Sequence, residues 1–259
     1  MNTTVLLWQK QMKKALVHSE EIIGLLIQPA LWVILFGVGM RGMMRTSPSP
    51  GGNDYMTFIV PGIVAMTAVS AAIAGGSTWL NERLLGIVKE YIVAPIPRLS
   101  ILMGHALSIV TKVLIQSIVI LMVGLLMGAK LSHNPWGWLG GLLLIAGYGI
   151  GFSGLALAVA SASDSSAGYH MMIFLLQLPL LFLSNSLYPL KTMPVWMRMG
   201  AYANPTTYVV SALRNIALSP TSMMSAMADI SLGLCFVITT GFAVLGMYTA
   251  LRAFKKTIQ

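Results

Sequence analysis

The sequence predicts an all-α integral membrane protein with six transmembrane helices, for three reasons. Of its 259 residues, 56% are hydrophobic and only 9% are charged, whereas an ordinary soluble domain carries about 25% charged residues. Apolar runs recur that reach the roughly 20 residues needed to cross a bilayer. Basic residues lie at the ends of these runs and not in one cluster, a pattern that fits anionic lipid headgroups and argues against nucleic acid as a partner.

Six stretches meet the length of a span, and together they make residues 1–259 a single transmembrane domain. They lie at 22–40, 56–79, 101–128, 138–162, 169–188 and 227–251. Small residues recur at helical spacing in the fourth stretch (Gly147, Gly151, Gly154) and in the second (Ala72, Gly76). Small residues at this spacing let helices approach closely, so we expect tight packing within the protein.

Two further segments have helical features but do not read as spans. In 1–21, Val5, Trp8, Met12 and Ala15 recur at helical spacing with lysines off that stripe, which predicts an interfacial helix. The segment 189–225 is too broken by proline for a span and too apolar for a free loop. Pro194 and Pro205 suit first helical positions, and Asn204 suits an N-cap. We expect two short helices here, lying in or dipping into the interface.

Basic residues near the span ends predict the orientation. With the N-terminus inside, nine Lys and Arg fall in inner segments and six in outer ones. Both termini and the loop 81–98 are therefore expected in the cytoplasm, with the protein in the cytoplasmic membrane. The loop 81–98 predicts a short two-faced helix, since Glu82, Arg83, Lys89 and Glu90 fall within an arc of about 120°. Its mixed charge favours a protein partner, and a helix lying on the lipid surface remains the alternative.

The sequence lacks the residue patterns that several kinds of chemistry require. The sequence contains no G-x-x-x-x-G-K-[ST] phosphate loop, so we expect no ATP site of this type in the chain. The expected spans hold almost no acidic residues, although ion-coupled carriers usually depend on them. The four histidines and one cysteine show no metal-ligand spacing. If the chain is a transporter, a soluble partner could supply the energy; a membrane-embedded enzyme and a passive channel remain open.

Four stretches resemble the permeases of the ABC type-2 family of drug, nodulation-factor and polysaccharide exporters. They are YMTFIVPGIV at 55–64, the loop NERLLGIVKEYIVAPIPR at 81–98, the segment 187–214 and the basic C-terminus. The likeness implies a coupling helix that docks on an ATPase, formed by Glu82, Arg83, Ile87, Lys89, Glu90 and Tyr91. It also implies an outer re-entrant helix pair and a unit of two permease chains with two ATPase chains. ATP and magnesium would be bound by the ATPase, and this chain would bind no cofactor.

The polar side chains of the fifth stretch bear on the cargo. Polysaccharide exporters of this family tend to line the path with aromatic residues, which are few here. A small amphipathic, drug-like or lipid-like cargo is therefore favoured, and polysaccharide or glycolipid export is the alternative. The candidate residues of the substrate path are Gln28, Gln177, Ser184, Asn185 and Tyr188.

Overall fold

The computed structural model describes residues 3–17, 19–44, 52–93, 96–129, 132, 134–217 and 230–257. Every regular element among these residues is a helix, which confirms the predicted all-α class. The helices are α1 (Thr3–Val17), α2 (Ser19–Met44), α3 (Gly52–Leu84), α4 (Ile87–Val93), α5 (Arg98–Leu126), α6 (Pro135–Ala162), α7 (Ser166–Phe182), α8 (Val195–Ala203), α9 (Pro205–Ala217) and α10 (Leu232–Thr257), with a 3-10 turn at Leu190–Thr192.

Four helical stretches are long and apolar enough to cross a membrane. They are Met56–Leu84, Leu99–Leu126, Pro135–Ala162 and Leu232–Phe254. Two shorter apolar stretches, Leu26–Phe36 and Ser166–Phe182, correspond to the first and fifth expected spans. The chain is thus a multi-pass membrane protein with several apolar helices, and the complete six-span arrangement stays a prediction. The start of the sixth expected span, at 227, lies outside the described residues.

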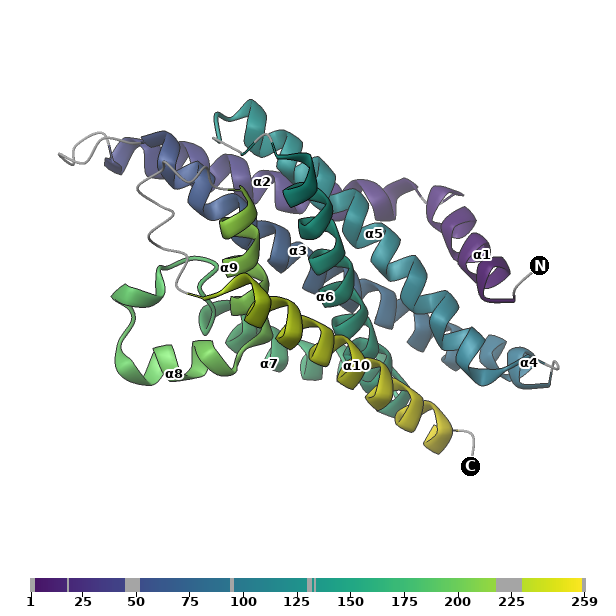
Figure 1. Ribbon diagram of the computed structural model, residues 1–259. Coiled ribbons are helices and arrows are strands. Elements are labelled where there is room, and N and C mark those ends of the chain that lie inside the picture. The colour runs from purple at the N-terminus through teal and green to yellow at the C-terminus, as the bar shows by residue number, and fades with distance from the viewer. Residues whose placement is uncertain are drawn as a thin grey trace.

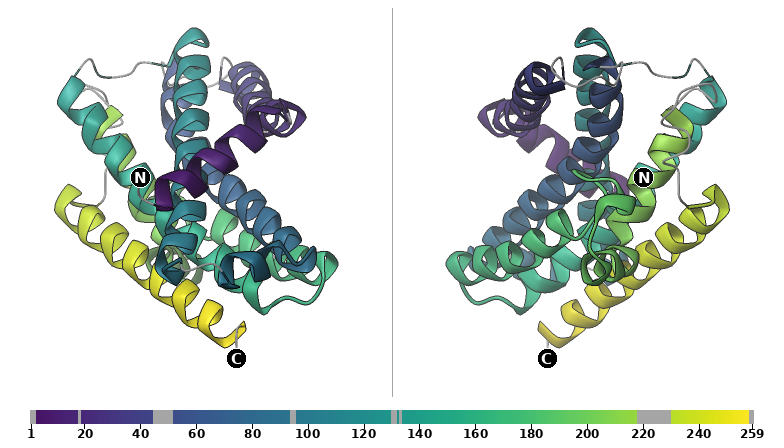
Figure 2. Two further views of the ribbon diagram at one scale, coloured as in Figure 1. Left: turned by 90° about the vertical axis from the view of Figure 1, so that its right-hand side faces the viewer. Right: turned by 90° about the vertical axis from the view of Figure 1, so that its left-hand side faces the viewer.

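The helices form an elongated bundle whose two ends carry different elements. In Figure 1, α1, α4 and the C-terminal end of α10 gather at one end, while α8 lies toward the other. The side views in Figure 2 show α1 crossing the bundle obliquely and α10 running along its flank. The short helices α4 and α8 therefore lie at opposite ends of the long apolar helices.

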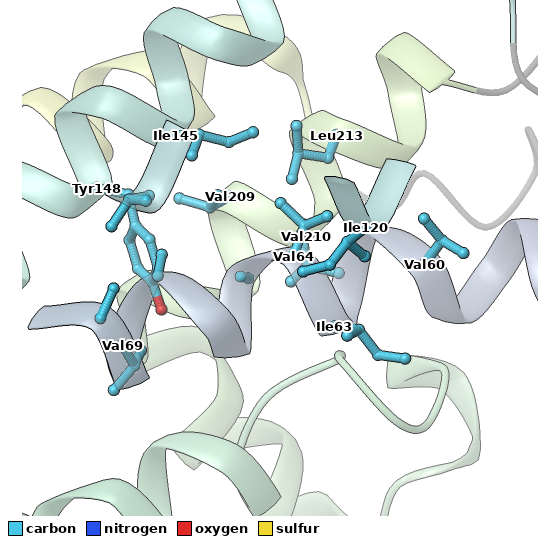
Figure 3. Packing of buried hydrophobic residues seen from close by; sticks show 14 of the residues in the cluster. Val60, Ile63, Val64, Val69, Ile120, Ile145, Tyr148, Val209, Val210 and Leu213 are labelled. Carbon is cyan, nitrogen blue, oxygen red and sulfur yellow. The ribbon is translucent and has the colours of Figure 1, made fainter. Parts of the chain in front are cut away.

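The central core is built around α3. Buried residues of α3 pack against α5, α6 and α9 in one apolar cluster, and Figure 3 shows Val64, Ile145 and Val210 converging from three of these helices. Tyr148 is fully buried there, and its hydroxyl shares a hydrogen bond of 2.8 Å with the Thr206 hydroxyl. Because a buried phenol needs a polar partner, this bond fixes α9 inside the bundle.

The glycines of α6 let α10 approach its backbone, which confirms the expected tight packing. A Cβ atom on Gly154 would lie 2.1 Å from the carbonyl carbon of Gly246, and one on Gly246 would lie 2.2 Å from the Gly151 oxygen. No side chain fits at such distances. Gly76 of α3 is likewise covered by the Tyr169 hydroxyl and by Ala156 of α6.

The fifth predicted span is wrong at its C-terminal boundary, because α7 ends at Phe182 and not at 188. Asn204 explains this early end: its side-chain amide donates to the backbone carbonyls of Leu180 and Leu183, at 2.9 and 2.7 Å. Carbonyls at a helix end need such partners. The Asn204 oxygen also accepts from the Thr206 backbone amide at 3.0 Å, so Asn204 caps α9 as predicted, with Pro205 as its first residue.

Arg214 lies inside the protein, although it is one of the six basic residues that the sequence assigns to the outer segments. It is 2% exposed, and its guanidinium lies 3.6 Å from the centroid of the Phe58 ring. Nε donates to the Phe58 carbonyl at 3.2 Å and Nη2 to the Ser186 carbonyl at 3.3 Å. The second of the two predicted short helices is thus anchored to α3 and to the turn after α7.

Replacing Asn204 with alanine is expected to destabilise the protein by about 2 kcal/mol, since it removes an N-cap and two hydrogen bonds to carbonyls. Asn134 is a matched control, because it caps α6 by one bond of 3.2 Å to the Trp136 amide and is exposed. Asn134→Ala should cost about 1 kcal/mol at most. Thermal unfolding in detergent checks the difference, and equal losses would contradict it.

Candidate functional site

The loop predicted as one charged helix is two helices joined by a tight turn. α3 ends at Leu84 and α4 begins at Ile87. Gly86 lies between them with φ of 81°, a conformation that glycine adopts without strain. The Leu85 amide donates to the Asn81 carbonyl and the Gly86 amide to the Arg83 carbonyl, at 2.9 and 3.1 Å. The four predicted charges therefore do not share one exposed arc, and that prediction is wrong.

Glu82 is buried at the meeting point of α1, α3 and α5. Its side chain is 2% exposed. Oε1 accepts from Gln11 Nε2 at 2.9 Å and lies 3.6 Å from Lys14 Nζ. Oε2 lies 3.4 Å from His105 Nε2, which is ion-pair distance without the alignment of a hydrogen bond. The Trp79 ring packs edge-on against His105 with centroids 4.7 Å apart. A buried charge needs such partners, so Glu82 binds α1 to the bundle.

The buried face of α1 differs from the predicted stripe. It consists of Leu7, Gln11 and Ala15, of which the sequence predicted only Ala15. Gln11 lies on this face because its amide reaches the Glu82 carboxylate. The backbone of α1 comes close to α5 at Gly104, where a Cβ atom would lie 2.7 Å from the Leu7 Cβ. Because the partner of Gln11 is far away in sequence, the spacing of apolar residues in α1 does not reveal that Gln11 lies on the buried face.

Arg83 points away from Glu82, toward the end of α6. Its guanidinium donates to the carbonyls of Ala160, at 3.2 Å, and Ser161. These belong to the last turn of α6, where carbonyls lack partners within the helix and a cation is favourable. Nη2 also lies 3.3 Å from Asp164 Oδ1, which is almost fully exposed and contributes little.

α4 presents an exposed face with both charged and apolar side chains. Val88 is buried and Ile87 half-buried, while Lys89 and Glu90 are exposed. Leu85 in the turn is 76% exposed and Val93 is 87% exposed. Tyr91 turns toward α1, where its hydroxyl accepts a hydrogen bond from Lys10 Nζ. Partial burial lowers the pKa of Lys10, but Tyr91, Glu82 and Glu90 outweigh this and raise the pKa above its ordinary value.

Two cavities adjoin along α7. The first, of about 150 Å³, lies between α2, α3, α7 and α9; its polar lining residues are Gln28, Thr67, Ser70, Gln177 and Thr206. The second, of about 270 Å³, lies between α3, α6, α7, α10 and the start of α9, and is lined almost wholly by apolar side chains. Val69, Gln177 and Leu180 line both. The structure thus brings together Gln28 and Gln177, two of the predicted path residues.

The other three predicted path residues lie elsewhere. Ser184 and Asn185 are buried in the turn that follows α7. The Ser184 hydroxyl donates to the Leu181 carbonyl at 2.8 Å, and the Asn185 amide donates to the Ser211 hydroxyl at 2.7 Å. Neither lines the two cavities, because the early end of α7 turns both inward against α9. Tyr188 is 51% exposed.

Among the described residues, no group of three or more His, Cys, Asp or Glu side chains gathers. The residues that sequence reasoning missed are Gln11, Trp79 and His105. All three contact Glu82 or each other from separate helices, and only the folded chain brings them together.

Comparison with known proteins gives a consistent picture. The chain is 31% identical over 194 residues to the transport permease ycf38 of Cyanophora paradoxa, covering 73% of this chain and 65% of that protein. It is 29% identical to ycf38 of Porphyra purpurea, covering 89% and 81%. It is 25% identical to the daunorubicin resistance ABC transporter permease DrrB1 of Streptomyces coeruleorubidus, covering 81% and 72%. The ABC-2 type transporter family matches residues 2–218. The chain therefore belongs to the ABC-2 type transporter family, whose membrane subunits are the permease components of ABC transporters.

Proposed function

We propose that this chain is the transmembrane permease subunit of an ATP-driven exporter in the cytoplasmic membrane. Six spans place both termini in the cytoplasm. Two copies assemble with two copies of a separate ATPase, which binds ATP and magnesium. The cargo is a small amphipathic, drug-like or lipid-like molecule that is moved outward. The observation that carries this proposal is α4, a short helix with an exposed mixed face at one end of a bundle of long apolar helices.

The exposed face of α4 suits a protein partner better than a lipid surface. It combines Lys89 and Glu90 with the exposed side chains of Leu85 and Val93. An anionic leaflet would repel Glu90, whereas an interface with a protein can pair both charges and cover the apolar side chains. Because Glu82 is buried and Arg83 caps α6, Lys89 and Glu90 are the charges we expect the ATPase to contact.

The two adjoining cavities support an amphipathic cargo. Their described lining residues include no charged side chain. The first offers neutral hydrogen-bonding groups, and the second offers an apolar space in which a polar molecule would lose its hydration without compensation. A sugar chain fits this pair poorly. A molecule with one polar and one apolar end fits both, and the daunorubicin resistance permease among the relatives supports a drug-like cargo.

Copurification tests the docking surface. Tagged full-length chain, extracted in mild detergent from the cells that naturally produce it, should carry an ATPase subunit in equal number. Lys89→Glu should lower the amount bound by about tenfold, since it reverses one charge in the interface. The control is Lys191→Glu, the same exchange at an exposed site in the 3-10 turn that precedes α8. Equal ATPase recovery with both variants would contradict docking through α4.

Gln177→Leu tests the cargo cavities, because it keeps the side-chain volume and removes the amide from both linings. Export of daunorubicin or another amphipathic dye with hydrogen-bonding groups should fall about tenfold, as expected for losing one or two hydrogen bonds to cargo. Leu178→Met on the same helix is the control, since Leu178 lines neither cavity. Unchanged export by the Gln177 variant in vesicles would remove Gln177 from the path.

A further inference from the structure

Three consecutive residues at the end of α3 reach three different parts of the bundle. Asn81 Oδ1 accepts from the Ser166 hydroxyl at the start of α7, at 3.3 Å. Glu82 contacts Gln11 and Lys14 of α1 and His105 of α5. Arg83 caps the last carbonyls of α6. Successive side chains on a helix point about 100° apart, so neighbouring residues at the end of α3 contact different elements around its axis.

We infer that Glu82 and Arg83 are positioning residues that connect α4 to two different parts of the bundle, and are not contacts with the ATPase. We call this pair, Glu82 with Arg83, the fork. The inference rests on the proposed function, because it takes docking at α4 as the event that the fork passes on. The sequence spacing had suggested that Glu82 and Arg83 share a docking face with Lys89 and Glu90. The structure instead places Glu82 and Arg83 in contacts within the bundle.

Glu82 and Arg83 each hold an element that leads along the chain into a helix lining the first cavity. Glu82 holds α1, and α1 leads through a single intervening residue into α2, which carries Gln28. Arg83 holds the end of α6 immediately before α7, which carries Gln177. The Gly86 turn joins α4 directly to the end of α3, which carries the fork. Val88 of α4 is also buried in the apolar cluster of Trp79, Leu80 and Phe254. A displacement of α4 therefore reaches α2 and α7 by separate routes.

The two routes differ in their surroundings. The Glu82 route is buried, so water does not compete with its bonds and an unpaired partner is costly. The Arg83 route rests on backbone carbonyls and is partly exposed. Lys10 and Tyr91 also join α1 to α4 directly, at an exposed site where such contacts are weak. The connection from α4 to α1 thus depends mainly on Glu82.

Hydrogen exchange of the full-length chain in lipid nanodiscs separates the arms without the ATPase. Glu82→Gln should raise exchange in residues 3–17 by about tenfold, the effect of losing one charge-assisted hydrogen bond, and leave 160–168 unchanged. Arg83→Gln should do the reverse. Glu90→Gln, on the exposed face of α4, is the matched control and should change neither segment. Equal effects of both fork variants on both segments would overturn the two-armed arrangement.

The ratio of dye exported to ATP hydrolysed tests whether the fork transmits. It is measured in vesicles that hold the chain with the ATPase that copurifies with it. Glu82→Gln and Arg83→Gln should bind the ATPase as the unchanged chain does but export about tenfold less dye per ATP. Glu90→Gln should weaken ATPase binding and keep the ratio. A fork residue that only maintained the fold would lower dye export and ATP hydrolysis together, leaving the ratio intact, and this result would overturn the inference. No ATP-driven export by the unchanged chain would instead contradict the proposed function itself.

Discussion

Gly154→Leu is expected to separate α10 from α6 and leave little folded protein. A Cβ atom at this position would lie 2.1 and 2.2 Å from the carbonyl carbon and oxygen of Gly246. These are backbone atoms, so no side-chain rotation relieves the overlap, and α10 must move as a whole. Overpacking typically costs about 1–3 kcal/mol when side chains can adjust, and a clash between backbones should exceed that range. Yield of monodisperse protein and its thermal unfolding in detergent measure the loss.

Gly241→Ala on α10 is the matched control. A Cβ atom on Gly241 meets nothing within 4 Å. Alanine is favoured over glycine in a helix by about 1 kcal/mol, so this variant should be as stable as the original chain or more so. If Gly154→Leu and Gly241→Ala unfold at the same temperature, the close crossing of α6 and α10 does not hold the bundle together.

Glu82→Lys is expected to dislodge α1 and destabilise the protein by about 3–5 kcal/mol, the usual cost of breaking a buried charge pair. The new ammonium would lie beside Lys14 and His105 in a site where the native side chain is 2% exposed. The sequence placed Glu82 and Glu90 on one arc of a surface helix, where reversing either charge would affect stability alike. The burial of Glu82 makes the two reversals very different.

Glu90→Lys makes the same chemical change on the exposed face of α4 and should alter stability by less than about 0.5 kcal/mol. Limited proteolysis of α1, together with thermal unfolding, distinguishes the two variants. The arrangement around Glu82 is contradicted if Glu82→Lys keeps α1 as protected as Glu90→Lys does.

The sequence was informative wherever a feature depends on neighbouring residues. Apolar runs located the long helices, because a membrane helix must satisfy its backbone internally and face lipid. The cap at Asn204 followed by Pro205 placed the start of α9, and the small residues of α6 indicated a close helix contact. Each of these signals comes from residues that are at most a few helical turns apart, so no distant partner was needed to interpret it.

The features that remained hidden depend on residues far apart in the chain. Gly86 could have continued a helix, and its positive φ is set by how α4 folds back on the bundle. Glu82 looks like a solvent-facing charge until Gln11 and His105 are placed beside it. α7 ends early because Asn204 binds its last carbonyls from a later segment. Partners that are distant in sequence produce no periodic pattern. The burial of a charged residue can therefore be recognised only in the folded structure, where its partners lie beside it.

ATP-driven uptake of an amphipathic dye by reconstituted vesicles tests the central claim most directly. The chain is purified once with the ATPase that accompanies it and once stripped of that subunit, and both preparations are placed in vesicles with the α4 end outward. We predict ATP hydrolysis and dye accumulation only in vesicles that hold both proteins, since the chain lacks a phosphate loop. Robust ATP hydrolysis by the stripped chain, or dye accumulation that needs no ATP, would contradict the account of this protein as a permease subunit driven by a separate ATPase.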